Sequence, residues 1–305
     1  MSVDRSLPPI LPVGTAVVTQ IDVRDRAGDV VHPRGSTGVI IHAPGDVAHR
    51  YRVSFPGGEQ TTLERGEMEV LGHFQQAGID NNEVDLWQFV IYRCVIGSRA
   101  YGLDHDASDT DRRGIYQPPA DVLWSLYGVP EQLENEQAQE CYWELEKFLK
   151  LALKANPNVL EVLYSPIVEH TTTIAEELLS IRHLLLSKLI YQTYNGYAMS
   201  QFRKLGQDIR KQGSIKWKHA MHLIRLLLAG IRALREQTVA VRVADEHRDR
   251  LMAIRDGEMA WEDIDAWRLE LHREFEKAFG ETELPERPDY DAANEFLIRA
   301  RRSVT

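Results

Sequence analysis

The stretch VIYRCVIGSRAYGLDHDASDTDRRGIY, residues 90–116, decides the fold expected for this chain. It opens with an apolar run rich in β-branched residues that ends at Ile96, and a second strand-like run ends at Tyr116. Gly97-Ser98, a short turn and a polar loop separate the two runs. Because alternating apolar runs bounded by Gly and polar residues are typical of strands, we predict two strands joined by this turn and loop.

Two aspartates, Asp109 and Asp111, stand at the start of the second predicted strand. Side chains alternate across a strand, so we expect both carboxylates on one face. Carboxylates a few ångströms apart repel each other, and a divalent cation relieves that repulsion. Since Mg²⁺ prefers oxygen ligands, the pair is a candidate metal site. Arg113 has the same strand parity and is expected either to contact a phosphate or to pair with one of the aspartates.

Gly97 and Ser98 are candidate phosphate ligands. Gly97 has no Cβ, so a phosphate could approach its backbone closely, and Ser98 adds a hydroxyl and an N–H at what could be a helix N-terminus. A phosphate cradle followed along the chain by metal-binding carboxylates is the arrangement that nucleotidyl transfer needs.

Gly97-Ser98 followed by Asp109-x-Asp111 resembles the signature of the polymerase-beta nucleotidyltransferase superfamily. The longer string at 97–116 is similar to predicted bacterial and phage nucleotidyltransferases that include an RNA-repair-associated branch. KFLKLALKANPNVLEVLYSP and YNGYAMSQFRKL…KWKHAMHLIRLL resemble the same family, in the same order. The resemblance implies that an NTP is the substrate, Mg²⁺ or Mn²⁺ the cofactor and an RNA 3′ end the acceptor.

The resemblance also implies a third carboxylate on a following strand, as a metal ligand and as the acceptor of the proton from the attacking hydroxyl. Glu140 is the first choice, because it begins a strand-like segment, and Glu144 is the second. The family more often has Asp near this position, where Gln139 and Glu140 stand here. Glu161 is a further candidate, although a helix-surface or capping charge is the simpler interpretation.

Residues 1–72 differ in character from the rest. Short β-branched runs alternate there with turn signals such as Pro33-Arg34-Gly35 and Pro56-Gly57-Gly58. Several short strands within so few residues predict a small, strongly bent antiparallel barrel of SH3-like type. Such a barrel is expected to bind a protein or RNA partner, or to serve as a packing module.

From residue 173 onward the apolar spacing predicts helices throughout, over 173–187, 188–205, 217–236, 243–255, 261–279 and 290–302. Lys218, His222 and Arg225 fall at i, i+4 and i+7, hence on one helical face. They belong to a locally basic segment, and we expect this face to bind the triphosphate or an RNA backbone. A solvated basic face is the alternative.

Composition limits the remaining choices. The 305 residues have 43% hydrophobic and 27% charged content, as in an ordinary soluble protein. The net charge of −10 argues against indiscriminate binding to nucleic acid but leaves room for a local basic groove. The two cysteines, Cys94 and Cys141, lie in apolar surroundings and are expected to be reduced. With no apolar run long enough to span a membrane and no secretory signal pattern, we expect a cytoplasmic protein without a membrane partner.

We therefore predict an α+β chain: an SH3-like β-barrel over 1–72, a mixed-sheet nucleotidyltransferase core over 83–170 and a helical domain over 171–305. The predicted reaction transfers NMP from an NTP to an acceptor hydroxyl. Two other functions stay open. One is nucleotide transfer to a protein side chain, as in antitoxin-like members of the superfamily. The other is a non-catalytic nucleotide-binding scaffold.

Overall fold

The computed structural model describes residues 10–25, 27–46, 49–76, 84–105, 108–212 and 215–304, without the side chains of 75, 76 and 208–212. The chain divides into two compact units, Met1–Val84 and Asp85–Thr305, and each is described by itself. The predicted border between residues 170 and 171 falls inside the second unit.

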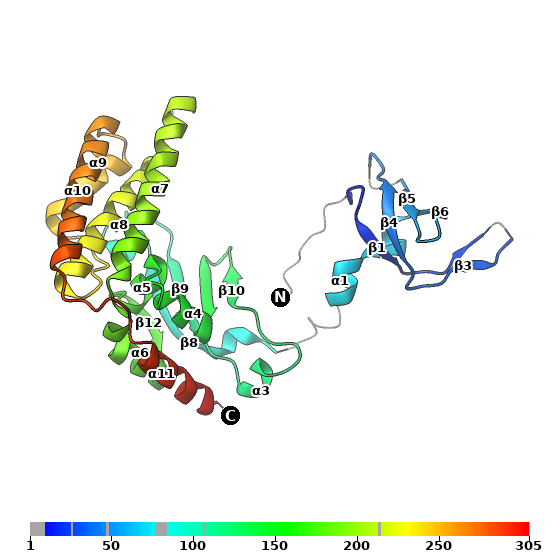
Figure 1. Ribbon diagram of the computed structural model, residues 1–305, viewed down its shortest axis with the longest axis horizontal. Helices are drawn as coiled ribbons and strands as arrows, with labels where there is room; N and C mark the ends of the chain where they lie inside the picture. Colours follow the sequence, from blue (N-terminus) through cyan, green and yellow to red (C-terminus); the bar gives the residue numbers. More distant parts are fainter. Residues whose placement is uncertain are drawn as a thin grey trace. The chain divides into compact units, whose positions relative to one another are not determined.

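The first unit is built on a five-stranded antiparallel sheet with the order β6-β5-β4-β1-β7 (Figure 1). The strands of this sheet are β1 (Ala16–Thr19), β4 (Thr37–His42), β5 (Tyr51–Ser54), β6 (Gln60–Leu63) and β7 (Met68–Val70). A separate two-stranded ribbon pairs β2 (Val23–Arg24) with β3 (Val30–His32). A 3₁₀ turn at Arg65–Glu67 leads into β7, and α1 (Leu71–Gln76) follows. Val17, Ile40, Tyr51 and Val53 are at most 1% exposed and form the centre of its core.

β1, β4, β5 and β6 lie within the β-branched runs of the sequence at 15–23, 37–43, 51–55 and 60–63, whereas β3 and β7 were missed because three residues carry too little periodicity. Within the described part of the chain β6 and β7 are edge strands that each pair on one side. The closure of this sheet into an SH3-like barrel therefore stays a prediction.

The second unit contains a mixed five-stranded sheet, β10-β11-β9-β8-β12. The strands are β8 (Val90–Ile96), β9 (Asp111–Tyr116), β10 (Gln132–Asn135), β11 (Glu140–Glu144) and β12 (Val168–Thr171). β9 and β11 run parallel, and the other neighbours are antiparallel. β8 and β9 approach closely at Gly114, where a Cβ would lie 1.9 Å from the carbonyl oxygen of Tyr92, so only glycine fits.

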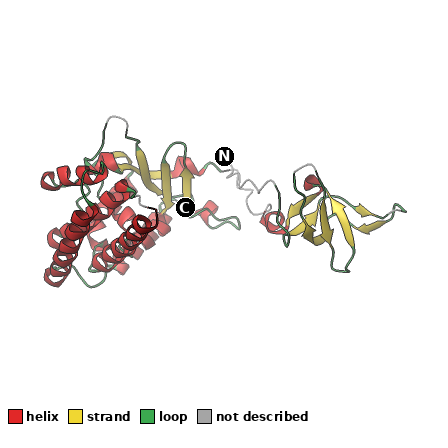
Figure 2. Ribbon diagram, turned by 90° about the horizontal axis from the view of Figure 1, so that it is seen from above, coloured by secondary structure: helices red, strands yellow, loops and turns green. Residues whose placement is uncertain are grey.

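Helices cover one face of this sheet (Figure 2). Six helices of this unit are α2 (Ser98–Tyr101), α3 (Ala120–Leu123), α4 (Leu145–Ala152), α5 (Pro157–Leu163), α6 (Thr173–Ile181) and α11 (Tyr290–Arg302), and 3₁₀ turns lie at Leu86–Phe89 and Arg182–Leu185. Asn156 caps the start of α5: its side chain accepts the N–H groups of Asn158 and Val159. The opposite face holds a smaller cluster around Tyr116 and Tyr142.

Four consecutive helices complete the unit: α7 (Leu189–Gln212), α8 (Trp217–Glu236), α9 (Asp245–Arg255) and α10 (Trp261–Glu281). α8 packs against the other three, and its apolar side joins the core cluster that also contains Cys94 and Ile115 of the sheet. The structure confirms a mixed α+β fold. Since one continuous cluster links sheet and helices, the core and the helical region share their stabilising burial. In the part of the chain that the structure describes, no helix is both long and apolar enough to cross a membrane.

Candidate active site

Gly97 ends β8 and begins the turn into α2. Its φ of 75° and ψ of −156° lie where an L-residue with a Cβ is strained. The Gly97 carbonyl accepts the N–H of Tyr101 at 3.0 Å, which closes the single turn of α2. Ser98 is only partly buried, and its hydroxyl makes no hydrogen bond with the residues that the structure describes. The predicted turn between strand and short helix is therefore present.

The carboxylate of Asp111 lies directly against Gly97. Asp111 is the first residue of β9 and pairs in register with Ile96, the last residue of β8. Its Oδ2 is 2.6 Å from the position that a Cβ on Gly97 would take. Glycine thus leaves the space that this carboxylate occupies. The pairing of β8 with β9 brings the two ends of the predicted motif together.

Asp109 lies outside the strand, which corrects the argument that placed both aspartates on one pleat. β9 begins at Asp111, and Asp109 is an exposed residue of the preceding loop. Arg99 holds this loop by donating from Nη2 to the Ser108 carbonyl at 2.8 Å and from Nε to the Asp109 carbonyl at 3.4 Å. The role of the Asp109 carboxylate stays a prediction.

Arg113 shares the Asp111 face, as its parity predicts. Its Nη2 is 3.8 Å from Asp111 Oδ1, and its Nη1 donates to the carbonyls of Arg112 and Gln139 at 2.8 and 2.9 Å. Of the two predicted alternatives, the structure contains the pairing with an aspartate.

Glu140 lies on the other face of the sheet. In the parallel pair of β11 with β9, Glu140 is opposite Arg112, and Cys141 is opposite Arg113. Because side chains of paired residues point to the same side, Glu140 shares the face of Arg112, away from Asp111. The first choice for a third ligand next to Asp111 is therefore not supported by the register. The sequence missed this because the register depends on the neighbouring strand.

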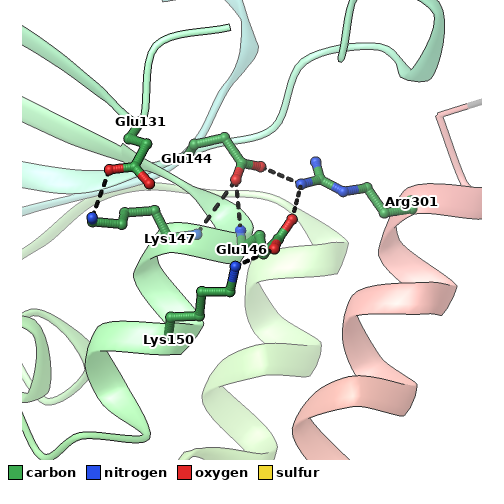
Figure 3. A network of polar contacts seen from close by, with 6 residues as sticks. All are labelled: Glu131, Glu144, Glu146, Lys147, Lys150 and Arg301. Atoms are coloured by element: carbon green, nitrogen blue, oxygen red, sulfur yellow. Dashed lines mark hydrogen bonds and ion pairs between the residues drawn. The ribbon is translucent and has the colours of Figure 1, made fainter. Parts of the chain in front are cut away.

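Glu144 lies on the same face of β11 as Glu140. Its carboxylate takes part in a network of polar contacts (Figure 3). Its carboxylate accepts the N–H of Glu146 at 2.9 Å and of Lys147 at 3.4 Å, so it caps α4. Arg301 of α11 donates to it at 2.5 Å, and both side chains are nearly buried. Glu144 thus ties the start of α4 to the last helix.

The described residues contain no group of three or more His, Cys, Asp or Glu that could hold a metal ion. What they offer a divalent cation is Asp111 beside Gly97, with the exposed Asp109 two residues earlier. Carboxylate oxygens that leave room for water and phosphate oxygens suit Mg²⁺, so the donor chemistry fits this ion.

A buried polar network stands behind α2. The hydroxyl of Tyr101 donates to Glu161 Oε2 at 2.6 Å, and Arg225 Nη1 lies 2.8 Å from Glu161 Oε1. The Arg225 guanidinium also stacks over the Tyr101 ring at 3.6 Å. Glu161 is 2% exposed, so its interpretation as a helix-surface charge is wrong. The sequence does carry a sign of this burial, because Glu161 is the single charged residue in the apolar run of α5. Burying a charge costs free energy unless the charge is paired, so such a position predicts a buried partner.

Arg225 is consequently not an open phosphate ligand. Burial is the largest influence on the pKa of Arg225 and lowers it, but the charge of Glu161, the hydrogen bond with Glu161 and the neighbouring tyrosines together raise the net pKa above its usual value. Burial raises the pKa of Tyr101, so its hydroxyl stays a proton donor. The predicted basic face of α8 thus has one member turned inward to a carboxylate.

His222 and Lys218 differ from Arg225 and from each other. Burial, then the charges of Arg225 and Lys218, lower the pKa of His222 to about 4, so the ring is neutral at pH 7. The His222 ring stands edge-on to Tyr101, with centroids 6.0 Å apart. Lys218 is exposed and makes no ion pair with any residue that the structure describes. Of the predicted trio, it alone offers an accessible positive charge.

A strand that ends in a Gly-Ser turn, with an aspartate of the neighbouring strand lying against the glycine, defines a polymerase-beta-like nucleotidyltransferase core. The chain belongs to the RNA repair pathway DNA polymerase beta family, whose sequence model matches residues 70–299. This confirms the resemblance drawn from the motif at 97–116.

Two curated relatives are themselves described as uncharacterized. YcgL of Bacillus subtilis strain 168 is 36% identical over 144 residues, which cover 46% of this chain and 54% of YcgL. MJ0002 of Methanocaldococcus jannaschii is 27% identical over 150 residues, which cover 47% of this chain and 60% of MJ0002. The matches thus span little more than half of each relative.

Proposed function

We propose that this protein is a metal-dependent nucleotidyltransferase that transfers NMP from an NTP to the 3′ hydroxyl of an RNA. The observation that carries the proposal is that the Asp111 carboxylate lies against Gly97, where the last residue of β8 pairs with the first residue of β9. Membership in a family described by an RNA repair pathway supports RNA as the acceptor.

In the proposed reaction the acceptor hydroxyl gives its proton to water and its oxygen attacks the α-phosphorus. The bond from that phosphorus to the bridging oxygen of the β-phosphate breaks, and pyrophosphate leaves. Asp111 and Asp109 hold Mg²⁺ or Mn²⁺, which when bound polarises the phosphate and lowers the pKa of the acceptor hydroxyl. Gly97 and Ser98 orient the β- and γ-phosphates through backbone N–H groups and the Ser98 hydroxyl. Lys218 adds positive charge toward the phosphates, and Arg113 holds Asp111 in place.

The test offers each of the four NTPs with Mg²⁺ and a short RNA, and compares the wild type with Asp109→Asn/Asp111→Asn. We expect RNA extended by NMP, released pyrophosphate and a rate about 10²–10³-fold lower in the variant. The same RNA with a blocked 3′ end is the acceptor control, and Asp121→Asn, an exposed acid on α3, is the matched protein control. Equal product yields from wild type and the double variant would overturn the mechanism.

A nucleotide-binding scaffold without transfer activity is the second candidate. The position of Glu140 on the far face favours it, because Cys141 and Trp143 are the β11 residues that share the Asp111 face. Binding of Mg²⁺·NTP without release of pyrophosphate would support the scaffold. Transfer to a side chain is tested by offering a protein substrate in a parallel reaction. A partner for the first unit would be sought in a separate binding assay.

A further inference from the structure

α2 cannot hold its own orientation. It has four residues, well below the length at which an isolated helix is stable in water. Glycines flank it on both sides: Gly97 at φ 75° and Gly102 at φ 72°. Because glycine permits many backbone conformations, the direction of this turn has to come from contacts with other elements.

Those contacts come from the helical region, 120 residues or more along the chain, and they converge on residues 101–103. Val243 N–H donates to the Tyr101 carbonyl at 3.1 Å. Arg248 Nε donates to the Gly102 carbonyl at 3.1 Å, and Arg255 Nη1 donates to the Leu103 carbonyl at 2.9 Å. Three consecutive carbonyls, from the last residue of α2 to the second residue after it, thus each accept a bond from the segment 243–255.

The buried network described above completes the attachment. Glu161 and Arg225 hold the Tyr101 ring and hydroxyl from α5 and α8. Charged donors on carbonyls make stronger hydrogen bonds than neutral ones. No local pattern singles out Arg248 or Arg255, since each is one of three arginines on a polar helix.

We propose that Arg248 and Arg255 are positioning residues, which fix the direction of α2 and so hold Gly97 and Ser98 ready for the phosphates of the nucleotide. Neither touches the reacting atoms. The inference rests on the proposed function in one respect only, namely that Gly97 and Ser98 bind phosphate. The geometry of the nucleotide site then depends on the position of α9.

The experiment compares Arg248→Gln/Arg255→Gln with Arg250→Gln in the full chain. Arg250 is the matched control, because it lies on the same helix and stacks on Trp267 at 3.7 Å, away from residues 101–103. Arg248→Lys/Arg255→Lys tests rescue, since a single ammonium can still donate to a carbonyl. Steady-state kinetics with NTP and RNA are measured beside calorimetric binding of Mg²⁺·NTP without RNA.

We expect the Gln pair to raise KM and the dissociation constant for NTP about ten-fold, with kcat within about two-fold of wild type. Tm should stay within about 2 °C, because α9 keeps its packing face of Leu251 and Ile254. Arg250→Gln should match the wild type, and the Lys pair should lie closer to wild type than the Gln pair.

Unchanged KM and binding in the Gln pair, or an equal rise in Arg250→Gln, would overturn the positioning role. A wild type that binds Mg²⁺·NTP without transferring it would overturn the proposed activity while the binding measurement still decides this inference. A wild type that binds no NTP would overturn both.

Discussion

The carboxylate of Asp111 fills the space beside Gly97 that any other residue at position 97 would need for its Cβ. Oδ2 lies 2.6 Å from that point, a distance that real Cβ contacts essentially never show. The φ of Gly97 is 75°, so a side chain there would be strained in the backbone as well. Glycine and aspartate at these two positions are therefore coupled, although 14 residues separate them in the sequence.

Gly97→Ala should abolish nucleotide transfer and lower the free energy of unfolding by about 1–3 kcal/mol, because it strains the backbone and displaces Asp111. Urea unfolding and an NTP turnover assay measure the two effects. Gly196→Ala is the control: it lies in α7 with open space around it and should stabilise the protein by about 0.5–1 kcal/mol. Full activity in Gly97→Ala would contradict the site.

Glu161→Gln should lower the free energy of unfolding by about 3–5 kcal/mol, because it leaves the buried Arg225 guanidinium without its charge partner. Chemical denaturation gives the value. The matched control is Glu236→Gln, which removes the exposed i,i+4 pair with Arg232 and should cost about 0.5 kcal/mol or less. Similar losses in the two variants would show that the buried pair has no special role.

Glu144→Ala should destabilise the protein by about 3–5 kcal/mol, because it removes the cap of α4 and leaves the nearly buried Arg301 with only its longer ion pair to Glu146, at 3.9 Å. Differential scanning calorimetry measures the resulting decrease in Tm. Glu131→Ala is the control in the same network (Figure 3): Glu131 is 72% exposed, and its loss should leave Tm unchanged. Transfer activity below the unfolding temperature should persist in both variants, and its loss in folded Glu144→Ala would instead indicate a role in the reaction.

Glu140→Gln should leave the rate of transfer within about two-fold of wild type, since the register turns its side chain away from Asp111. The measurement is the initial rate with saturating NTP and RNA. A fall comparable to that of the aspartate variants, about 10²-fold or more, would restore Glu140 as the third carboxylate and require a different register.

His222 should make the protein less stable in mild acid. Burial, then the charges of Arg225 and Lys218, lower its pKa from 6.5 to about 4 in the folded state. Between these two values the unfolded chain binds the proton more readily, so stability falls as pH drops from 6.5 to 4, by up to about 3 kcal/mol. Unfolding curves of His222→Gln across this range should show a shallower pH dependence than those of wild type. The exposed His183→Gln serves as control and should keep the wild-type slope.

Local sequence predicted much of the fold. The helices at 217–236 and 290–302 begin and end where apolar periodicity and flanking residues place them. Gly97-Ser98 forms the expected turn between a strand and a short helix. The register does not support Glu140 as the third carboxylate, because the face that a strand residue takes depends on its pairing with another strand. The expectation that Arg225 lies on an exposed basic face was wrong for a related reason. Its partner, Glu161, is 64 residues away in the sequence, so local spacing does not show that the two side chains pair.

By itself the sequence determined the elements, the Gly-Ser turn and the pair of aspartates, because helix and strand periods and the missing Cβ of glycine are local properties. Only the tertiary structure decided which charges meet. The pairing of β8 with β9 seats Asp111 on Gly97, and the packing of α8 and α9 brings Arg225, Arg248 and Arg255 to the end of α2. Charge partners depend on distances in space, and a folded chain makes those distances short between residues that the sequence keeps far apart.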